Sequence, residues 1–151
     1  MKKFKIIDHT ADIGIEVYGK NLNELFANAA RGMFSIITEL DKVKNVESTR
    51  IEIFQPTLED LLRLWLGELL FKQNTEEMLF NKFDVQIDEQ KLKLNGRASG
   101  EKFNAERHHL KTEIKAVTYH QLEIERCAIN LPVARHGDKH FRYRARVIFD
   151  V

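Results

Sequence analysis

The sequence predicts an α+β fold in which two helices pack on a mostly antiparallel β-sheet of about eight short strands. Two segments repeat their apolar residues at helical spacing, whereas most of the remaining segments alternate apolar and polar residues with a period of two. Clean alternation is typical of antiparallel strands that have one face in water. The elements follow a ββαββ order rather than alternating strand and helix, which favours α+β over α/β.

The first helix is predicted from Leu22 to Ile37. Its apolar residues keep the i, i+3, i+4, i+7 spacing without a break: Leu22, Leu25, Phe26, Ala29, Ala30, Met33, Phe34 and Ile37. Asn21 is a suitable N-cap, and Glu24 can answer the Asn21 backbone N–H. Gly32 inside this helix costs about 1 kcal/mol relative to alanine, so we expect it to mark a close packing contact.

The second helix is predicted to begin after Pro56, with Thr57 as its cap and Asp60 at the third helical position. Its expected core face consists of Leu58, Leu61, Leu62, Trp65, Leu69 and Leu70. Leu64, Leu66 and Phe71 widen the apolar surface beyond one stripe. Such a helix is covered on more than one side, either by its own domain, which is the commoner outcome, or by a partner.

The predicted strands follow from shared apolar faces. These faces are Ile13, Ile15 and Val17; Ile51 and Ile53; Phe83, Val85 and Ile87; Leu92 and Leu94; Ile114, Ala116 and Thr118; Leu122 and Ile124; and Tyr143, Ala145, Val147 and Phe149. The turn at residues 88–90 predicts a hairpin into residues 91–97. Residues 128–141 contain Pro132 and Gly137 and are expected to form a mobile connecting loop.

Length and composition indicate one soluble domain that spans residues 1–151, with 43% hydrophobic and 31% charged residues. The net charge of +1 argues against a generally basic surface for nucleic acid. Cys127 is the only cysteine, which excludes an internal disulfide and a cysteine-rich zinc site. No signal peptide and no apolar stretch of about 18 residues is found, so we expect a cytoplasmic protein without a membrane span.

Acidic residues lie at the ends of two predicted strands. Asp12 precedes the strand that starts at Ile13, and Asp150 follows the strand that ends near Phe149. If these strands are antiparallel neighbours, the two carboxylates face each other, and the terminal carboxylate of Val151 adds further oxygens. Repulsion between them favours a cation, and hard oxygen ligands suit Ca²⁺, Mg²⁺ or Mn²⁺. The alternative is that Asp12 caps a turn and Asp150 is a solvated end residue.

Other polar residues carry weaker signals. His9 lies beside the acids and is either a ligand, a proton carrier or a turn histidine bonded to backbone. Lys115 is expected on the polar face of its strand. A basic row formed by Arg142, Arg144 and Arg146 is either a solvated strand face or a phosphate-binding patch. Zinc binding by His108, His109 and His120 has little support without a metal-binding motif.

Three motifs together are similar to those of the archease family. They are residues 8–14 (DHTADIG), residues 111–120 (KTEIKAVTYH) and the C-terminal residues 147–151 (VIFDV), and the resemblance covers the whole chain. It implies an α+β protein that assists an RNA-splicing ligase of the RtcB type in tRNA splicing and RNA repair. The family promotes formation of the ligase–guanylate intermediate and sustains multiple turnover, and it does not join RNA itself.

The resemblance also implies roles for single residues. Asp12, Asp150 and Val151 would hold a divalent metal ion, with Ca²⁺ as the first expectation and Mg²⁺ or Mn²⁺ as alternatives. Lys115 and His9 would assist the ligase, and RNA would be contacted only through the ligase complex. Two other functions compete with this one: a chaperone or adaptor for RNA-modifying enzymes, and a stand-alone metal-dependent phosphoesterase. The absence of a phosphate-binding glycine loop and of a nucleophile motif argues against an independent enzyme.

Overall fold

The fold class predicted from the sequence is confirmed by the computed structural model, which describes residues 3–8, 12–127 and 142–151. The described residues form two helices and eight strands. In chain order these elements are β1 (Phe4–Asp8), β2 (Asp12–Gly19), α1 (Leu22–Ile37), a 3₁₀ turn (Leu40–Lys42), β3 (Glu47–Phe54), α2 (Leu58–Glu76), β4 (Met78–Asp88), β5 (Lys93–Lys102), β6 (Ala116–Val117), β7 (Glu123–Arg126) and β8 (Tyr143–Asp150).

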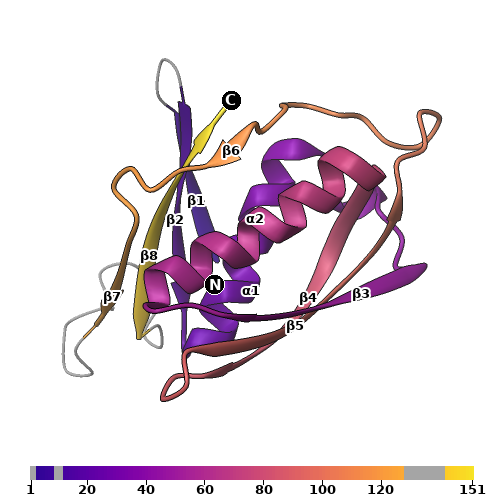
Figure 1. The fold of residues 1–151 in the computed structure, drawn as a ribbon. Coiled ribbons are helices and arrows are strands. Elements are labelled where there is room, and N and C mark those ends of the chain that lie inside the picture. Colours follow the sequence, from indigo (N-terminus) through magenta and orange to yellow (C-terminus); the bar gives the residue numbers. More distant parts are fainter. Residues whose placement is uncertain (1–2, 9–11, 128–141) are drawn as a thin grey trace.

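The strands are divided between two sheets, and every pairing among the described strands is antiparallel. The first sheet has the order β1-β2-β8-β6, and β7 also pairs with β8, so β6 and β7 share one edge of β8. The second sheet has the order β3-β5-β4. Figure 1 shows both helices between the two sheets, with the C-terminal end of the chain beside β6. The helices therefore supply the core for both sheets.

Helix α1 has the predicted bounds and the predicted cap. The Asn21 side chain accepts a hydrogen bond from the Glu24 backbone N–H at 2.8 Å. The reciprocal bond differs from our expectation, because the Glu24 carboxylate accepts from the backbone of Lys20 rather than of Asn21. Gly32 marks the expected close contact: an ideal Cβ there would lie 3.1 Å from Cδ1 of Ile15 and 3.2 Å from the ring of Phe4. A side chain at this position would push α1 away from the first sheet.

Helix α2 begins after its predicted cap, Thr57, which accepts from the Asp60 backbone N–H at 3.0 Å. Its buried residues are Leu61, Leu62, Trp65, Leu66, Leu69 and Leu70, so Leu66 belongs to the core and Leu58 is only partly buried. The Trp65 indole N–H donates to the Phe26 carbonyl at 3.0 Å, which ties α2 to α1. Most of the apolar surface is therefore covered by the protein itself, whereas Phe71 remains 60% exposed.

Two strand predictions require correction, and one strand was not predicted. The hairpin of β4 and β5 is present, but Leu92 lies in the turn at φ 52° and the second strand starts at Lys93. The strand predicted at residues 114–118 contains only Ala116 and Val117, because β6 covers only the end of β8. Strand β1 was not predicted, since it has only five residues and Ile6 is 44% exposed.

Two further predictions concerned a membrane-spanning helix and a long connecting loop. No helix in this part is long and apolar enough to cross a membrane. The expected connecting loop at residues 128–141 lies outside the described residues.

Candidate functional site

The two acids predicted to meet are direct cross-strand partners. Strands β2 and β8 pair in antiparallel register with Asp12 opposite Asp150. Side chains at such positions project from the same face of a sheet, with Cβ atoms about 4.5–5.5 Å apart. The opposed pair Ile15 and Val147 lies on the other face of the sheet and is fully buried. Because side chains alternate between the two faces of a strand, both acids point away from the core. The sheet therefore places two carboxylates side by side at its end.

One carboxylate oxygen of this pair lacks a hydrogen-bond partner. Oδ1 of Asp12 is buried from solvent and accepts no hydrogen bond from the residues that the structure describes, whereas Asp150 is exposed. A buried polar atom without a partner is costly and rare in native proteins. A carboxylate oxygen in this position, facing a second carboxylate, fits a bound cation, which would satisfy the oxygen and offset the repulsion.

The remaining candidate ligands lie at or near the same end. Val151, the third predicted ligand, directly follows Asp150 and is partly buried. Within the described ranges, no group of three or more His, Cys, Asp or Glu side chains gathers as a metal site. His9 lies outside the described residues. The side-chain donors that the described residues bring together here, Asp12 and Asp150, are carboxylates, which suit hard divalent ions such as Ca²⁺.

Lys115 is attached to the same strand end through its backbone. Its N–H donates to the Asp150 carbonyl at 2.7 Å, directly before β6 continues along β8. Ile114 is fully buried and Lys115 is exposed, as the alternation predicted. No ion pair of the Lys115 ammonium occurs within the described part of the chain. A fixed backbone with a free cationic side chain thus adjoins the acid pair.

The segment that leads to Lys115 is held by a buried ionic cluster. Glu101 is 5% exposed and accepts hydrogen bonds from both terminal nitrogens of Arg107, at 2.8 and 2.7 Å, and from the Lys44 backbone at 2.7 Å. Nε2 of His108 lies 2.9 Å from the same carboxylate. The bonds from Arg107 are the main reason that the pKa of Glu101 falls to about 2, against the opposing effect of burial.

Replacing Glu101 by glutamine is expected to lower the free energy of unfolding at pH 7 by about 2–3 kcal/mol. Removal of one partner from a fully buried ion pair typically costs about 3–5 kcal/mol. The cost expected here is smaller, because the Arg107 side chain is 38% exposed and can be hydrated after its partner is lost. Because the folded pKa is depressed, the contribution of Glu101 is complete above its ordinary pKa of 4.5 and is lost as the pH falls towards about 2. Urea unfolding at several pH values measures this difference.

The exposed acid Glu106 in the same segment offers a matched control. Glu106→Gln should leave the unfolding midpoint almost unchanged throughout the pH range. A constant difference between wild type and Glu101→Gln down to pH 2 would contradict the assigned ionic role.

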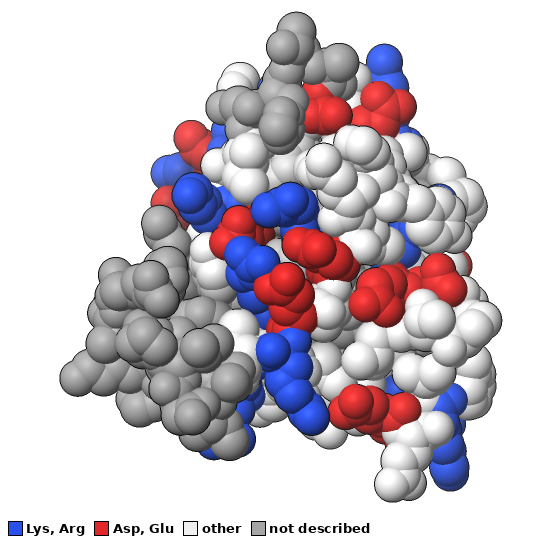
Figure 2. Space-filling view, turned by 90° about the vertical axis from the view of Figure 1, so that its left-hand side faces the viewer, with Lys and Arg blue, Asp and Glu red and all other residues white. Residues whose placement is uncertain are grey.

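One arginine of the predicted basic row, Arg144, forms ion pairs with acids, whereas Nε of Arg146 is buried and has no hydrogen-bond partner among the described residues. Strand register places Arg144 opposite Tyr18 and Glu125, and Arg146 opposite Glu16 and Glu123. The Arg144 guanidinium forms ion pairs with Glu16 and Glu125. Figure 2 shows the result on this side of the molecule, where Lys and Arg side chains are interleaved with Asp and Glu side chains. Of the two interpretations of the row, a solvated strand face or a phosphate-binding patch, the ion pairs favour the strand face for Arg144 alone.

The arginines are also separated from the acid pair. Arg146 lies four residues before Asp150 in β8, which corresponds to about 13 Å along a strand. Between them Ile148 is 3% exposed and lies over Gly14, where an ideal Cβ would approach its Cδ1 to 2.7 Å. The third arginine, Arg142, lines a separate pocket with Lys20 and Arg126. Apolar contact thus isolates the carboxylates from the ionic face.

Zinc binding through His108 is not compatible with its contacts. Nδ1 accepts a hydrogen bond from the Asn104 backbone at 2.8 Å, and Nε2 contacts Glu101. Both ring nitrogens are therefore used within the fold. Sequence reasoning missed this buried cluster, because the spacing of Glu101, Arg107 and His108 resembles that of an ordinary charged surface segment.

Known proteins match the chain over nearly its full length. The model of the Archease protein family matches residues 4–151. Protein archease of Sulfurisphaera tokodaii is 48% identical over 125 residues, which cover 83% of this chain and 90% of the relative. Protein archease of Saccharolobus solfataricus is 47% identical over 126 residues, which cover 83% and 91%. The solution structure of Methanobacterium thermoautotrophicum protein 1598 has a TM-score of 0.81 and 40% identity, with 100% of both chains covered. The chain belongs to the archease family.

Proposed function

We propose that this protein is a non-catalytic cofactor of an RtcB-type RNA ligase in tRNA splicing and RNA repair. It promotes guanylylation of the ligase and sustains its multiple turnover. Membership of the archease family supports this role. The structural observation that supports a metal site is the cross-strand pair of Asp12 and Asp150. The buried Oδ1 of Asp12 has no hydrogen-bond partner among the described residues.

In this proposal Asp12, Asp150 and the carboxylate of Val151 hold a divalent ion, Ca²⁺ in the first place and Mg²⁺ or Mn²⁺ as alternatives. The ion would supply positive charge that binds carboxylate and phosphate oxygens. The chain itself fixes the two acids by strand register and holds the backbone of Lys115 against Asp150. His9 belongs to the same proposal through its place in the first motif.

Lys115 supplies a second positive charge in the proposed mechanism. Its ammonium can bind phosphate oxygens of the guanylate or carboxylates of the ligase. The chain has a net charge of +1, and Arg144 is already paired with two glutamates. The proposal therefore does not require this protein to have a broad phosphate-binding surface. RNA is contacted only through the ligase complex.

Guanylylation of a cognate RtcB-type ligase tests this function. We expect wild-type protein to stimulate the reaction, and we expect Asp150→Ala and Lys115→Ala to reduce the rate to that of the ligase alone. Matched controls are Asp84→Ala on the second sheet and Lys111→Ala in the segment before β6, since both side chains are exposed. Full stimulation by folded Asp150→Ala and Lys115→Ala proteins would contradict the proposed site.

A chaperone or adaptor for RNA-modifying enzymes is the second candidate. Large apolar side chains on the surface favour it, since Phe71 is 60% and Tyr119 is 63% exposed. This function predicts partner binding that does not change when divalent ions are chelated. Loss of ligase stimulation in EDTA, with recovery on addition of Ca²⁺, would favour the ligase cofactor instead.

A further inference from the structure

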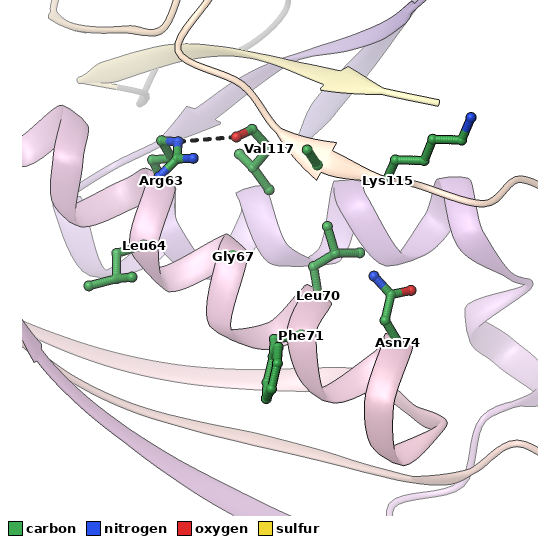
Figure 3. A pocket seen from close by; sticks show the side chains of 9 residues that line it. Arg63, Leu64, Gly67, Leu70, Phe71, Asn74, Lys115 and Val117 are labelled. Carbon is green, nitrogen blue, oxygen red and sulfur yellow. Dashed lines mark hydrogen bonds between the residues drawn. The ribbon is translucent and has the colours of Figure 1, made fainter.

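A groove of about 260 Å³ runs between α2 and β6. Figure 3 shows Leu70 of α2 facing Val117 of β6 across it, with Gly67 on the helix between the neighbouring turns. Leu64 and Phe71 extend the apolar lining along the helix. The groove begins beside the acid pair, because Lys115 both lines it and donates its backbone N–H to Asp150.

Gly67 is the unusual residue of this groove. An interior helical glycine costs about 1 kcal/mol relative to alanine. Gly32 in α1 is explained by close packing, since an added Cβ would lie 3.1 Å from Ile15. Gly67 has no such explanation, because an ideal Cβ at this position would have no atom within 4 Å apart from its neighbouring residues and the surrounding backbone of the helix. The protein thus carries a destabilising residue that keeps space open on its outer surface.

The charges at the groove have one sign. Arg63 and Lys115 line it, and its described lining residues include no acid. Arg63 is held in place, because Nε donates to the Val117 carbonyl at 3.1 Å and its guanidinium lies 4.0 Å from the centre of the Tyr119 ring. The Lys115 ammonium, in contrast, forms no ion pair with the described residues. An occupant that matches this surface combines an apolar group over Gly67 with a negative charge near Lys115.

We propose that this groove is a docking site for an extended acidic and apolar peptide segment of a partner protein. One apolar side chain of the segment fills the space over Gly67, between Leu70 and Val117. A neighbouring carboxylate of the segment pairs with Lys115. Docking here places the partner directly beside Asp150, at the end of β8.

A peptide fits this groove better than a nucleic acid does. Its lining includes three aliphatic side chains, Leu64, Leu70 and Val117, and one aromatic ring, Phe71, which Figure 3 shows directed away from β6. The Tyr119 ring, which is not among the lining residues, has the Arg63 guanidinium over one face. Single-stranded nucleic acid is bound by stacking on aromatic rings and by several cations along its backbone. A mainly aliphatic space beside Lys115, which forms no ion pair within the described part of the chain, instead suits a single apolar side chain and a carboxylate.

The test uses short synthetic peptides and the full-length protein. The probe peptide has a central leucine flanked by aspartates, and two control peptides replace the leucine by alanine or the aspartates by asparagines. We expect saturable NMR shifts of the Gly67, Phe71 and Lys115 amides with the probe, and binding at least about tenfold weaker with either control. Absence of saturable shifts with the probe would overturn the proposal, as would equal or stronger shifts with oligouridylate.

Two variants of α2 locate the binding site. Gly67→Leu fills the open space, is expected to raise Tm because it removes a helical glycine, and should weaken probe binding at least about tenfold. Gln73→Leu adds the same side chain outside the groove and should bind the probe like wild type. Unchanged affinity of Gly67→Leu would overturn the proposal. Since this variant keeps Asp12 and Asp150, the result is independent of whether the protein stimulates a ligase.

Discussion

Addition of about 10 mM Ca²⁺ is expected to raise the Tm of the wild-type protein by about 3–10 °C relative to EDTA. With few protein ligands, the site should bind Ca²⁺ with a Kd of about 10⁻⁴–10⁻³ M. A concentration of about 10 mM then exceeds Kd about 10–100-fold. Because Ca²⁺ binds the folded state, it raises the free energy of unfolding by about 1.4–2.7 kcal/mol. For a chain of 151 residues, each kcal/mol corresponds to about 2–4 °C.

Asp12→Asn should abolish this response. In EDTA the variant should melt at the same temperature as wild type or slightly higher, because removal of one carboxylate relieves repulsion by Asp150. A purely structural Asp12 would show the opposite pattern, with a lower Tm in EDTA and an unchanged response to Ca²⁺. Thermal scans of both proteins, with Mg²⁺ and Mn²⁺ as further additions, distinguish the two cases and rank the ions.

Gly100→Ala is expected to lower the free energy of unfolding by about 3–4 kcal/mol, the largest stability effect of a single methyl group in this fold. An ideal Cβ at Gly100 would overlap the Leu79 carbonyl oxygen and lie 2.8 Å from Cα of Phe80. These are backbone atoms of β4 next to the irregular register between Phe80 and Lys82. Because no side-chain rotation can relieve the overlap, β4 and β5 must separate locally.

Gly14→Ala is the matched control for this prediction. Its nearest atom would be Cδ1 of Ile148 at 2.7 Å, the end of a flexible side chain that can rotate. We expect this variant to lose no more than about 1 kcal/mol. Urea unfolding of both variants measures the difference. Equal losses in the two proteins would show that the backbone overlap at Gly100 is not the cause.

Local sequence signals were sufficient to predict most of the fold. Both helices have strong apolar spacing and explicit caps at Asn21 and Thr57, and these signals depend only on nearby residues. Division of the strands into two sheets could not be predicted, because it depends on which helix face each strand covers. The reduction of the strand at residues 114–118 to β6 has a similar reason, since β6 and β7 compete for one edge of β8.

The sequence was sufficient to predict which two acids meet at the candidate site, but not how deeply they are buried. The positions of Asp12 and Asp150 at opposite ends of two strands implied their contact if the strands were antiparallel neighbours, and the register confirms that arrangement. The burial of Oδ1 of Asp12 could not be predicted, because it requires three-dimensional packing. The groove at Gly67 was missed as well, since a glycine facing open space has the same sequence signal as a packed glycine such as Gly32.

The most direct test of a single functional site compares guanylylation of an RtcB-type ligase with Asp12→Asn, Asp150→Asn and the double variant at saturating Ca²⁺. If both acids bind one ion, either single variant should remove the stimulation, and the double variant should be no worse than the singles. If the acids act separately, each single variant should retain part of the stimulation and their effects should multiply in the double variant. That second result would contradict a shared cation site.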